Sequence, residues 1–163
     1  MAATLVGGST VSADRGKVVV HTAPVLREHS DFMINAAIPP GDGRLEQLWV
    51  RKLGDYQFEL CCIPFFLFDV ALGDVVETDV DFRLSRVIQP SGRSVFRVWF
   101  GESFHPRQQI ADELVALGAL LEWSSVNLLA VDAADRDHAR RLADCLFAHE
   151  QAGRLTYETG QSA

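Results

Sequence analysis

LGALLEWSSVNLLAVDA, residues 117–133, contains two short apolar segments that decide the fold of the last third of the chain. Each segment, Leu120–Trp123 and Leu128–Val131, has the length and composition of a short β-strand. The polar residues Ser124, Ser125 and Asn127 separate them and favour a turn, because Ser and Asn side chains hydrogen-bond to nearby backbone groups. The stretch therefore predicts a β-hairpin.

A helix is predicted on each side of this hairpin, because apolar residues recur there at spacings of three and four. The first helix is predicted to be capped by Ser103, with Pro106 near its first turn, and to end at Gly118. The second is capped by Asp132 or Asp135 and ends at Gly153. The apolar positions are Ile110, Leu114, Val115 and Leu117 in the first helix and Ala139, Leu142, Ala143, Leu146 and Phe147 in the second.

Two further strands, Val95–Phe100 and Leu155–Thr159, extend the pattern to β-α-β-β-α-β, the element order of a ferredoxin-like domain. We expect each helix to return the chain to a strand beside the one it left, by a right-handed crossover. Both helices then cover one face of a four-stranded sheet. The other face is left to pack against the rest of the chain.

The middle of the chain predicts five or six short strands joined by tight turns, at Gly54-Asp55, Leu72–Asp74 and Ser91–Ser94. The segment His21–Gly43 is rich in Pro and Gly and predicts no regular structure. Short strands of this kind hide their edges by curling into a small sheet or barrel. The strands are predicted at residues 17–20, 46–53, 56–63, 75–80 and 82–89.

The predicted fold class is therefore α+β, with two folded parts. Residues 16–93 form a small curled β-sheet or barrel, and residues 94–163 form the ferredoxin-like domain. Residues 1–15 have neither the basic start nor the apolar stretch of a secretory signal, and we expect them to be a mobile leader.

Composition argues against several classes of protein. A net charge of −7 with scattered Lys and Arg argues against nucleic-acid binding. No apolar run approaches the roughly 20 residues that a membrane span needs. Cys61, Cys62 and Cys145 make an odd number and read as reduced thiols of a cytoplasmic protein. Because no Cys-x-x-Cys spacing is present, we predict no metal site, and no motif indicates a cofactor.

Four phrases in a fixed order resemble an uncharacterised bacterial family, the domain-of-unknown-function family 4265. The resemblance spans Lys17 to Gly160, nearly the whole chain. It brings no catalytic residue, because the family has no agreed activity. The phrases are IPFF (63–66), LGDVV (72–76), SGRS (91–94) and LAVD (129–132).

One residue departs from the pattern of the family. Arg93 stands in the SGRS hairpin where the resemblance leads us to expect His. A guanidinium stays protonated near neutral pH and so cannot act as a general base. The departure therefore argues against acid–base chemistry at this position.

The favoured candidate site is a ligand-binding surface at the junction of the two parts. Its polar component is Ser91, Arg93 and Ser94, whose hydroxyls, guanidinium and exposed amides suit a carboxylate or phosphate. Its apolar component is three Phe residues in four positions, which cannot all point to one face of a strand. The alternatives are a plain hairpin turn and ordinary core packing. The apolar residues are Phe65, Phe66 and Phe68, with Trp123 from the predicted hairpin.

An alternative polar site comprises Glu102, His105 and Asp132, with His138 beside Asp135. A His near a carboxylate can act as a general base, although helix capping explains the two Asp residues equally well.

The adjacent thiols Cys61 and Cys62 form a third candidate. Strand alternation predicts one thiol inward and one outward. A cysteine nucleophile would also need a base such as His21 or His29.

Three classes of function follow. The favoured one is a non-catalytic ligand-binding or regulatory module, whose partner is a small molecule or a protein. The second is a small biosynthetic or modifying enzyme that uses Glu102, His105 or Asp132. The third is a protein-interaction factor of the immunity type. An open edge strand would also allow a homodimer.

Overall fold

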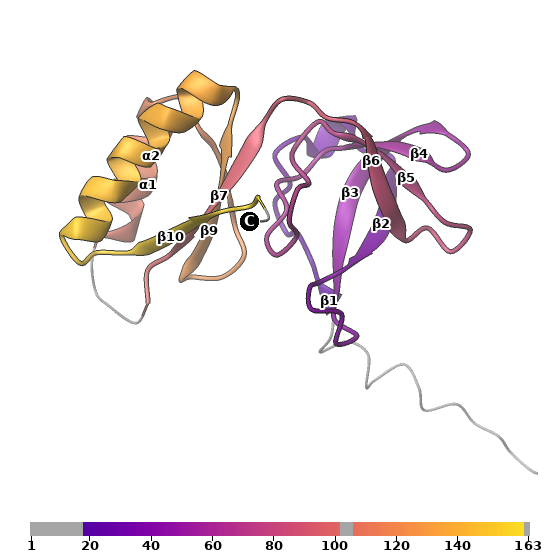
Figure 1. The fold of residues 1–163 in the computed structure, drawn as a ribbon, viewed down its shortest axis with the longest axis horizontal. Helices are drawn as coiled ribbons and strands as arrows, with labels where there is room; N and C mark the ends of the chain where they lie inside the picture. Colours follow the sequence, from indigo (N-terminus) through magenta and orange to yellow (C-terminus); the bar gives the residue numbers. More distant parts are fainter. Residues whose placement is uncertain (1–17, 102–105, 162–163) are drawn as a thin grey trace, which may run out of the picture.

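The computed structural model describes residues 18–101 and 106–161, which form two β-sheets and two α-helices (Figure 1). The chain is therefore of mixed α and β content, as predicted. The predicted leader, residues 1–15, lies outside the described residues, and so does the predicted helix cap Ser103.

The first sheet, here the N-terminal sheet, has the order β1-β3-β4-β5-β6, and β2 also pairs with β3 in antiparallel register. A parallel bridge joins Asn35 of β2 to Arg83 beside β6, and the Asn35 N–H donates to the carbonyl of Phe82 at 3.1 Å. The sheet therefore curls toward closure. Its strands are β1 (Val18–Val19), β2 (Phe32–Ala37), β3 (Leu45–Gly54), β4 (Gln57–Leu60), β5 (Val75–Thr78) and β6 (Leu84–Gln89), with a 3₁₀ turn, η2 (Arg27–His29), before β2.

The absence of regular structure predicted for His21–Gly43 is wrong, because this segment contains β2. All six residues of β2 pair with β3 in antiparallel register. Ile34 and Ala36 point into the core, whereas Met33 is exposed. The nearby Pro and Gly residues all lie outside the strand, so they do not prevent the alternating residues from pairing.

The second sheet, here the C-terminal sheet, has the order β10-β7-β9-β8 and is antiparallel throughout. The elements follow the order β-α-β-β-α-β along the chain. One expectation is wrong: neither helix returns the chain to a neighbouring strand, since β9 lies between β7 and β8, and β7 between β9 and β10. The elements are β7 (Ser94–Trp99), α1 (Arg107–Ala116), β8 (Leu120–Trp123), β9 (Leu128–Ala133), α2 (Arg136–Gln151) and β10 (Thr156–Thr159).

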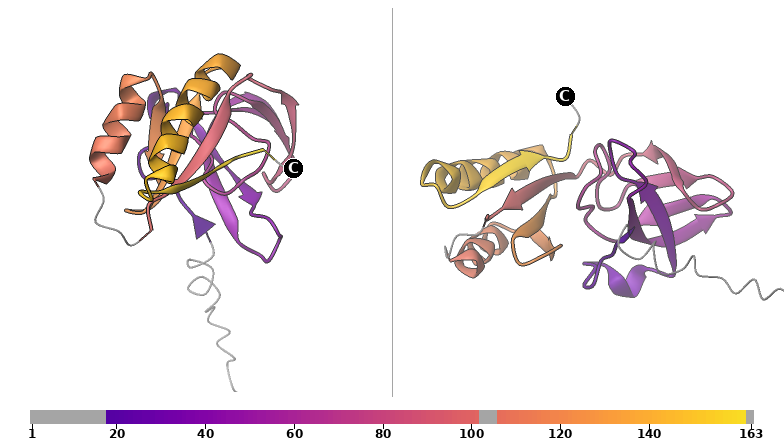
Figure 2. Two further views of the ribbon diagram at one scale, coloured as in Figure 1. Left: turned by 60° about the vertical axis from the view of Figure 1, so that its left-hand side comes forward. Right: turned by 90° about the horizontal axis from the view of Figure 1, so that it is seen from below.

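Both helices cover the same face of the C-terminal sheet, on the side away from the N-terminal sheet (Figures 1 and 2). Leu114 of α1 and Leu142 and Leu146 of α2 are fully buried against Val98 and Leu129 of the sheet. Burying each of these leucine side chains stabilises the folded state by about 1.5–3 kcal/mol. This face holds the larger apolar core of the C-terminal half.

The opposite face of the C-terminal sheet meets the N-terminal half, at a contact that we call the seam. Val95 of β7 and Ala130 of β9 supply its apolar residues from the C-terminal sheet. The segment after β4 supplies the others, and the whole cluster is buried. The seam cluster is Ile63, Phe65, Ala71, Leu72, Val95 and Ala130.

The cap of α2 gives a test of the local structure. The Asp135 carboxylate accepts the N–H of His138 at 2.8 Å, which satisfies a donor at the helix start. We expect Asp135→Ala to lower the free energy of unfolding by about 0.5–2 kcal/mol in urea denaturation. Asp137→Ala removes an exposed charge from the same turn and should change it by less than about 0.5 kcal/mol. Equal effects would contradict the capping role.

Candidate functional site

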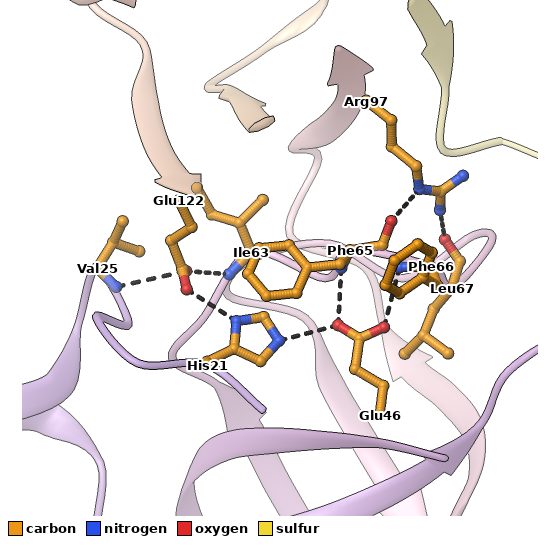
Figure 3. A network of polar contacts seen from close by, with 9 residues as sticks. All are labelled: His21, Val25, Glu46, Ile63, Phe65, Phe66, Leu67, Arg97 and Glu122. Carbon is orange, nitrogen blue, oxygen red and sulfur yellow. Dashed lines mark hydrogen bonds and ion pairs between the residues drawn. The ribbon is translucent and has the colours of Figure 1, made fainter. Parts of the chain in front are cut away.

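A buried histidine lies between two carboxylates beside the seam (Figure 3). Nδ1 of His21 lies 2.8 Å from Oε1 of Glu122, and Nε2 lies 2.9 Å from Oε1 of Glu46. His21 follows β1, Glu46 belongs to β3 and Glu122 belongs to β8. The three side chains are between 0% and 2% exposed. The contacts thus join three segments that are far apart in the sequence.

Each carboxylate also accepts backbone N–H groups. Glu122 accepts from Ile63 at 2.5 Å and from Val25 at 3.4 Å, while Glu46 accepts from Phe65 at 2.7 Å and Phe66 at 2.9 Å. A backbone N–H can only donate, so the carboxylate oxygens are the acceptors. These hydrogen bonds offset the loss of water around the two buried carboxylates.

The His21 ring is suited to carry the matching positive charge. Burial by itself lowers the pKa of His21, but hydrogen bonds to Cys62, Glu122 and Glu46 outweigh it and raise that pKa from 6.5 to about 11. An imidazolium can donate from both ring nitrogens at once. The ring of Phe65 stacks on it, with centroids 4.0 Å apart and planes within 9°.

Arg97 of β7 contacts the same loop from the other side. Its guanidinium donates to the carbonyls of Phe65 and Leu67 (Figure 3). Its Nη1 also lies 3.2 Å from Oε1 of Glu158. The backbone of residues 63–67 is therefore bound through its N–H groups by two glutamates and through its carbonyls by one arginine. Because His21, Glu46, Glu122 and Arg97 are all buried, we assign this network a role in positioning the chain.

A cleft of about 600 Å³ opens beside the seam, between the two halves of the molecule. Val70 and Ala71 line it from the N-terminal half, and Val95 and Phe96 from β7. Its polar lining comprises Asp69, Asp74, Arg93, Ser94, Arg136, Thr159 and Gln161.

Arg93 is held in place within this cleft by Asp132 of β9. Its Nε lies 3.0 Å from Oδ1 of Asp132, and its Nη2 contacts Oδ2 at 2.5 Å. Asp132 is buried, and the side chain of Arg93 is 29% exposed. A planar guanidinium fixed in this two-point manner keeps the rest of its N–H groups in a defined direction.

The residues predicted for the ligand site separate in the structure. Arg93 and Ser94 line the cleft. Ser91 borders it: its N–H donates to Asp74 at 2.7 Å, and its hydroxyl accepts the N–H of Arg93 at 3.1 Å. Phe65 belongs to the seam cluster and has no exposed surface to offer a ligand.

The other two phenylalanines lie apart from the cleft. Phe66 lines a separate hollow of about 270 Å³, together with Arg97 and Trp99. Phe68 is 40% exposed, and the guanidinium of Arg97 lies 4.7 Å from its ring centroid.

The placement of Trp123 at the seam is wrong. Its ring packs on Phe100 in the helix-covered core, with centroids 5.7 Å apart. Alternation along β8 explains this, because neighbouring residues point to opposite faces and Glu122 takes the seam side. The polar residue of this strand thus faces the junction, and the aromatic residue faces the helices.

The alternative polar site does not come together among the described residues. Glu102 and His105 lie outside them. Asp132 pairs with Val95 at the start of β7, so it stands at the other end of that strand from Gly101. His138 connects two turns. Its Nδ1 accepts the N–H of Ala134 at 2.9 Å, and its Nε2 lies 2.8 Å from the carbonyl oxygen of Leu117.

Cys61 and Cys62 are both buried, so the expectation of one inward and one outward thiol is wrong. The strand β4 ends at Leu60, and alternation does not continue beyond it. Burial raises the pKa of Cys62, and burial with nearby Glu59 raises that of Cys61 to about 11. Both groups are therefore thiols near neutral pH and poor nucleophiles.

The sequence reading missed Glu46 and the burial of His21. A signal was present, because Glu122 interrupts the apolar segment Leu120–Trp123 and Glu46 begins the predicted strand 46–53. A charged residue at an inward position needs a buried partner.

The fold and the site define a class of α+β protein in which two sheets are joined by a buried His and two carboxylates. The chain belongs to the family described as Domain of unknown function (DUF4265), which matches residues 46–157 and confirms the resemblance seen in the sequence. No curated protein matches the chain.

A solved structure supports the fold. It is described as a novel crystal structure of a hypothetical protein from Neisseria gonorrhoeae, with a TM-score of 0.66 and 18% identity to this chain. The match covers 82% of this chain and 97% of that one. Among the described residues, no helix is both long and apolar enough to cross a bilayer.

The charge of His21 makes stability depend on pH. Below about pH 6.5 the ring is protonated in the folded and the unfolded chain, and its full contribution to stability is present. As pH rises toward 11, the unfolded chain loses this proton first, so the contribution falls. We compare how steeply the free energy of unfolding falls between about pH 6.5 and 8.5. This slope should be steeper in the wild type than in His21→Gln, by up to about 1.4 kcal/mol per pH unit.

The measurement is urea denaturation at a series of pH values. The exposed His29 provides the control, and His29→Gln should keep the pH profile of the wild type. Identical slopes for the wild type and His21→Gln would show that His21 is neutral in the folded protein.

Proposed function

We propose that the protein is a non-catalytic ligand-binding module that holds a small acidic molecule in the cleft beside the seam. The observation that carries the proposal is the cleft itself, with two arginines in a wall that is otherwise mostly apolar. Its volume of about 600 Å³ is in the usual range for small-molecule sites, which favour the junctions between folded parts.

Arg136 gives the cleft its preference for an anion. It lies in the first turn of α2, where the helix dipole favours negative charge. Among the residues that the structure describes, no carboxylate lies within ion-pair distance of it. The positive charge of Arg93, by contrast, is matched by Asp132.

The acidic residues of the cleft restrict where a ligand anion can sit. Both carboxylate oxygens of Asp74 are engaged, by the N–H of Ala71 at 2.9 Å and of Ser91 at 2.7 Å. Asp69, the residue after Phe68, also lines the cleft. We therefore place the anionic group of the ligand at Arg136 and its apolar body against Val70, Ala71 and Val95.

Binding is favoured over catalysis by the residue types in the cleft. None of its described lining residues is His or Cys. The side chains with strongly shifted pKa values, His21 and Cys61, are buried outside it. Acid–base or nucleophilic groups are thus separated from the space where a ligand fits.

The arrangement of the two sheets agrees with this role. We interpret the C-terminal half as ferredoxin-like and the N-terminal half as a small curled sheet or barrel, supported by the element order and by the bridge from Asn35 to Arg83. In this interpretation, the sheet face free of helices packs on the N-terminal half and leaves the cleft at its border.

Arg136→Gln tests the site, with Arg141→Gln as a matched control on an exposed part of the same helix. Probes are a panel of small carboxylates and phosphate monoesters, screened by thermal shift and native mass spectrometry. A charged hydrogen bond contributes about 1.5–3 kcal/mol, so Arg136→Gln should bind about 10- to 100-fold more weakly. Arg141→Gln should bind as the wild type does.

Two results would contradict the proposal. One is that no acidic probe binds the wild-type protein. The other is that Arg136→Gln and Arg141→Gln retain equal affinity, which would place any binding outside the cleft.

A further inference from the structure

Three side chains of different chemistry meet on the two helices, away from the seam. Cys145 and His149 are four residues apart on α2 and so share one face of that helix. Glu113 reaches them from α1, with Oε2 2.7 Å from Nε2 of His149 and 4.0 Å from Sγ of Cys145. The three candidate ligand atoms all lie within 4.8 Å of one another.

We propose that Glu113, Cys145 and His149 form a binding site for a divalent transition metal, with Zn²⁺ as the best match. A thiolate, an imidazole and a carboxylate are the three types of protein ligand that Zn²⁺ accepts. Three protein ligands with a water at the fourth position give tetrahedral coordination. Mg²⁺ and Ca²⁺ require mainly oxygen ligands and do not suit this set.

The observed distances are close to those that coordination requires. Zn–N and Zn–O distances of about 2.0–2.2 Å at a tetrahedral angle place the nitrogen and oxygen ligands about 3.4 Å apart. A Zn–S distance of about 2.3 Å places sulfur and oxygen about 3.6 Å apart. The present separations of 2.7 Å and 4.0 Å therefore need changes of about half an ångström.

The burial of the ligands allows these changes. The side chain of His149 is 12% exposed and is therefore held by packing, whereas that of Glu113 is 44% exposed and can move. Cys145 is partly buried beside them. A metal can thus approach from solvent toward a fixed imidazole and an adjustable carboxylate.

Binding requires two protons to move. In the metal-free protein, Nδ1 of His149 lies 3.1 Å from Nη1 of Arg154, so Nδ1 accepts and Nε2 carries the ring proton. Coordination through Nε2 shifts this proton to Nδ1, and Arg154, which is exposed, must turn away. The Cys145 thiol releases its proton to solvent and binds as a thiolate. Arg154 therefore opposes metal binding.

Titration of the reduced full-length protein with Co²⁺ tests the site, because Co²⁺ replaces Zn²⁺ and reports thiolate coordination in its near-ultraviolet absorption. We expect a saturable one-to-one absorption band that Zn²⁺ abolishes. Cys145→Ser should remove the band, and Glu113→Gln and His149→Gln should weaken binding about ten-fold or more. Arg154→Gln should strengthen it.

The control is His29→Gln, which removes an exposed imidazole on η2 and should leave the titration unchanged. Glu113→Gln alters an exposed side chain and keeps the fold testable even where His149→Gln unfolds the protein. The proposal is overturned by the absence of a saturable band, or by a band that persists in Cys145→Ser, which would assign the thiolate to Cys61 or Cys62.

Discussion

The position of His21 between Glu46 and Glu122 is the constraint on which the rest of the structure depends. Removing these three side chains from water is costly, and only mutual pairing with further donors offsets that cost. The donors are backbone amides of the loop that follows β4, so the charges also fix the path of that loop. Replacement of one partner leaves the others buried and uncompensated, which makes this contact specific to one arrangement of the two sheets.

The location of the cleft follows from that arrangement. Ala71 and Val95 belong both to the seam cluster and to the cleft wall, so the network that fixes the seam also fixes the space beside it. Arg97 adds the corresponding contact from β7. The molecule therefore separates two roles: its charged interior determines structure, and its partly exposed arginines are available for a ligand. The cluster on the helices is independent of both.

Local patterns predicted the C-terminal half well, because helical spacing and the hairpin at residues 117–133 depend on neighbours in sequence. The strand β2 was missed because nearby Pro and Gly residues obscured its alternation. Trp123 was misplaced although alternation with Glu122 was readable. The partners of His21 could not be predicted, since they lie 25 and 101 residues away and only the tertiary fold brings them together. The four-residue spacing of Cys145 and His149 was visible, whereas Glu113 enters from another helix.

Nitrogen NMR of the His21 side chain shows whether the ring between the two carboxylates is charged. In uniformly ¹⁵N-labelled protein, the His21 resonances are assigned by comparison with His21→Gln. We expect both ring nitrogens to carry protons at neutral pH. We also expect the ring to stay an imidazolium well above its ordinary pKa of 6.5. A neutral ring at pH 7, titrating near that ordinary value, would contradict this assignment, because one of the two carboxylates would then face a ring nitrogen without a proton.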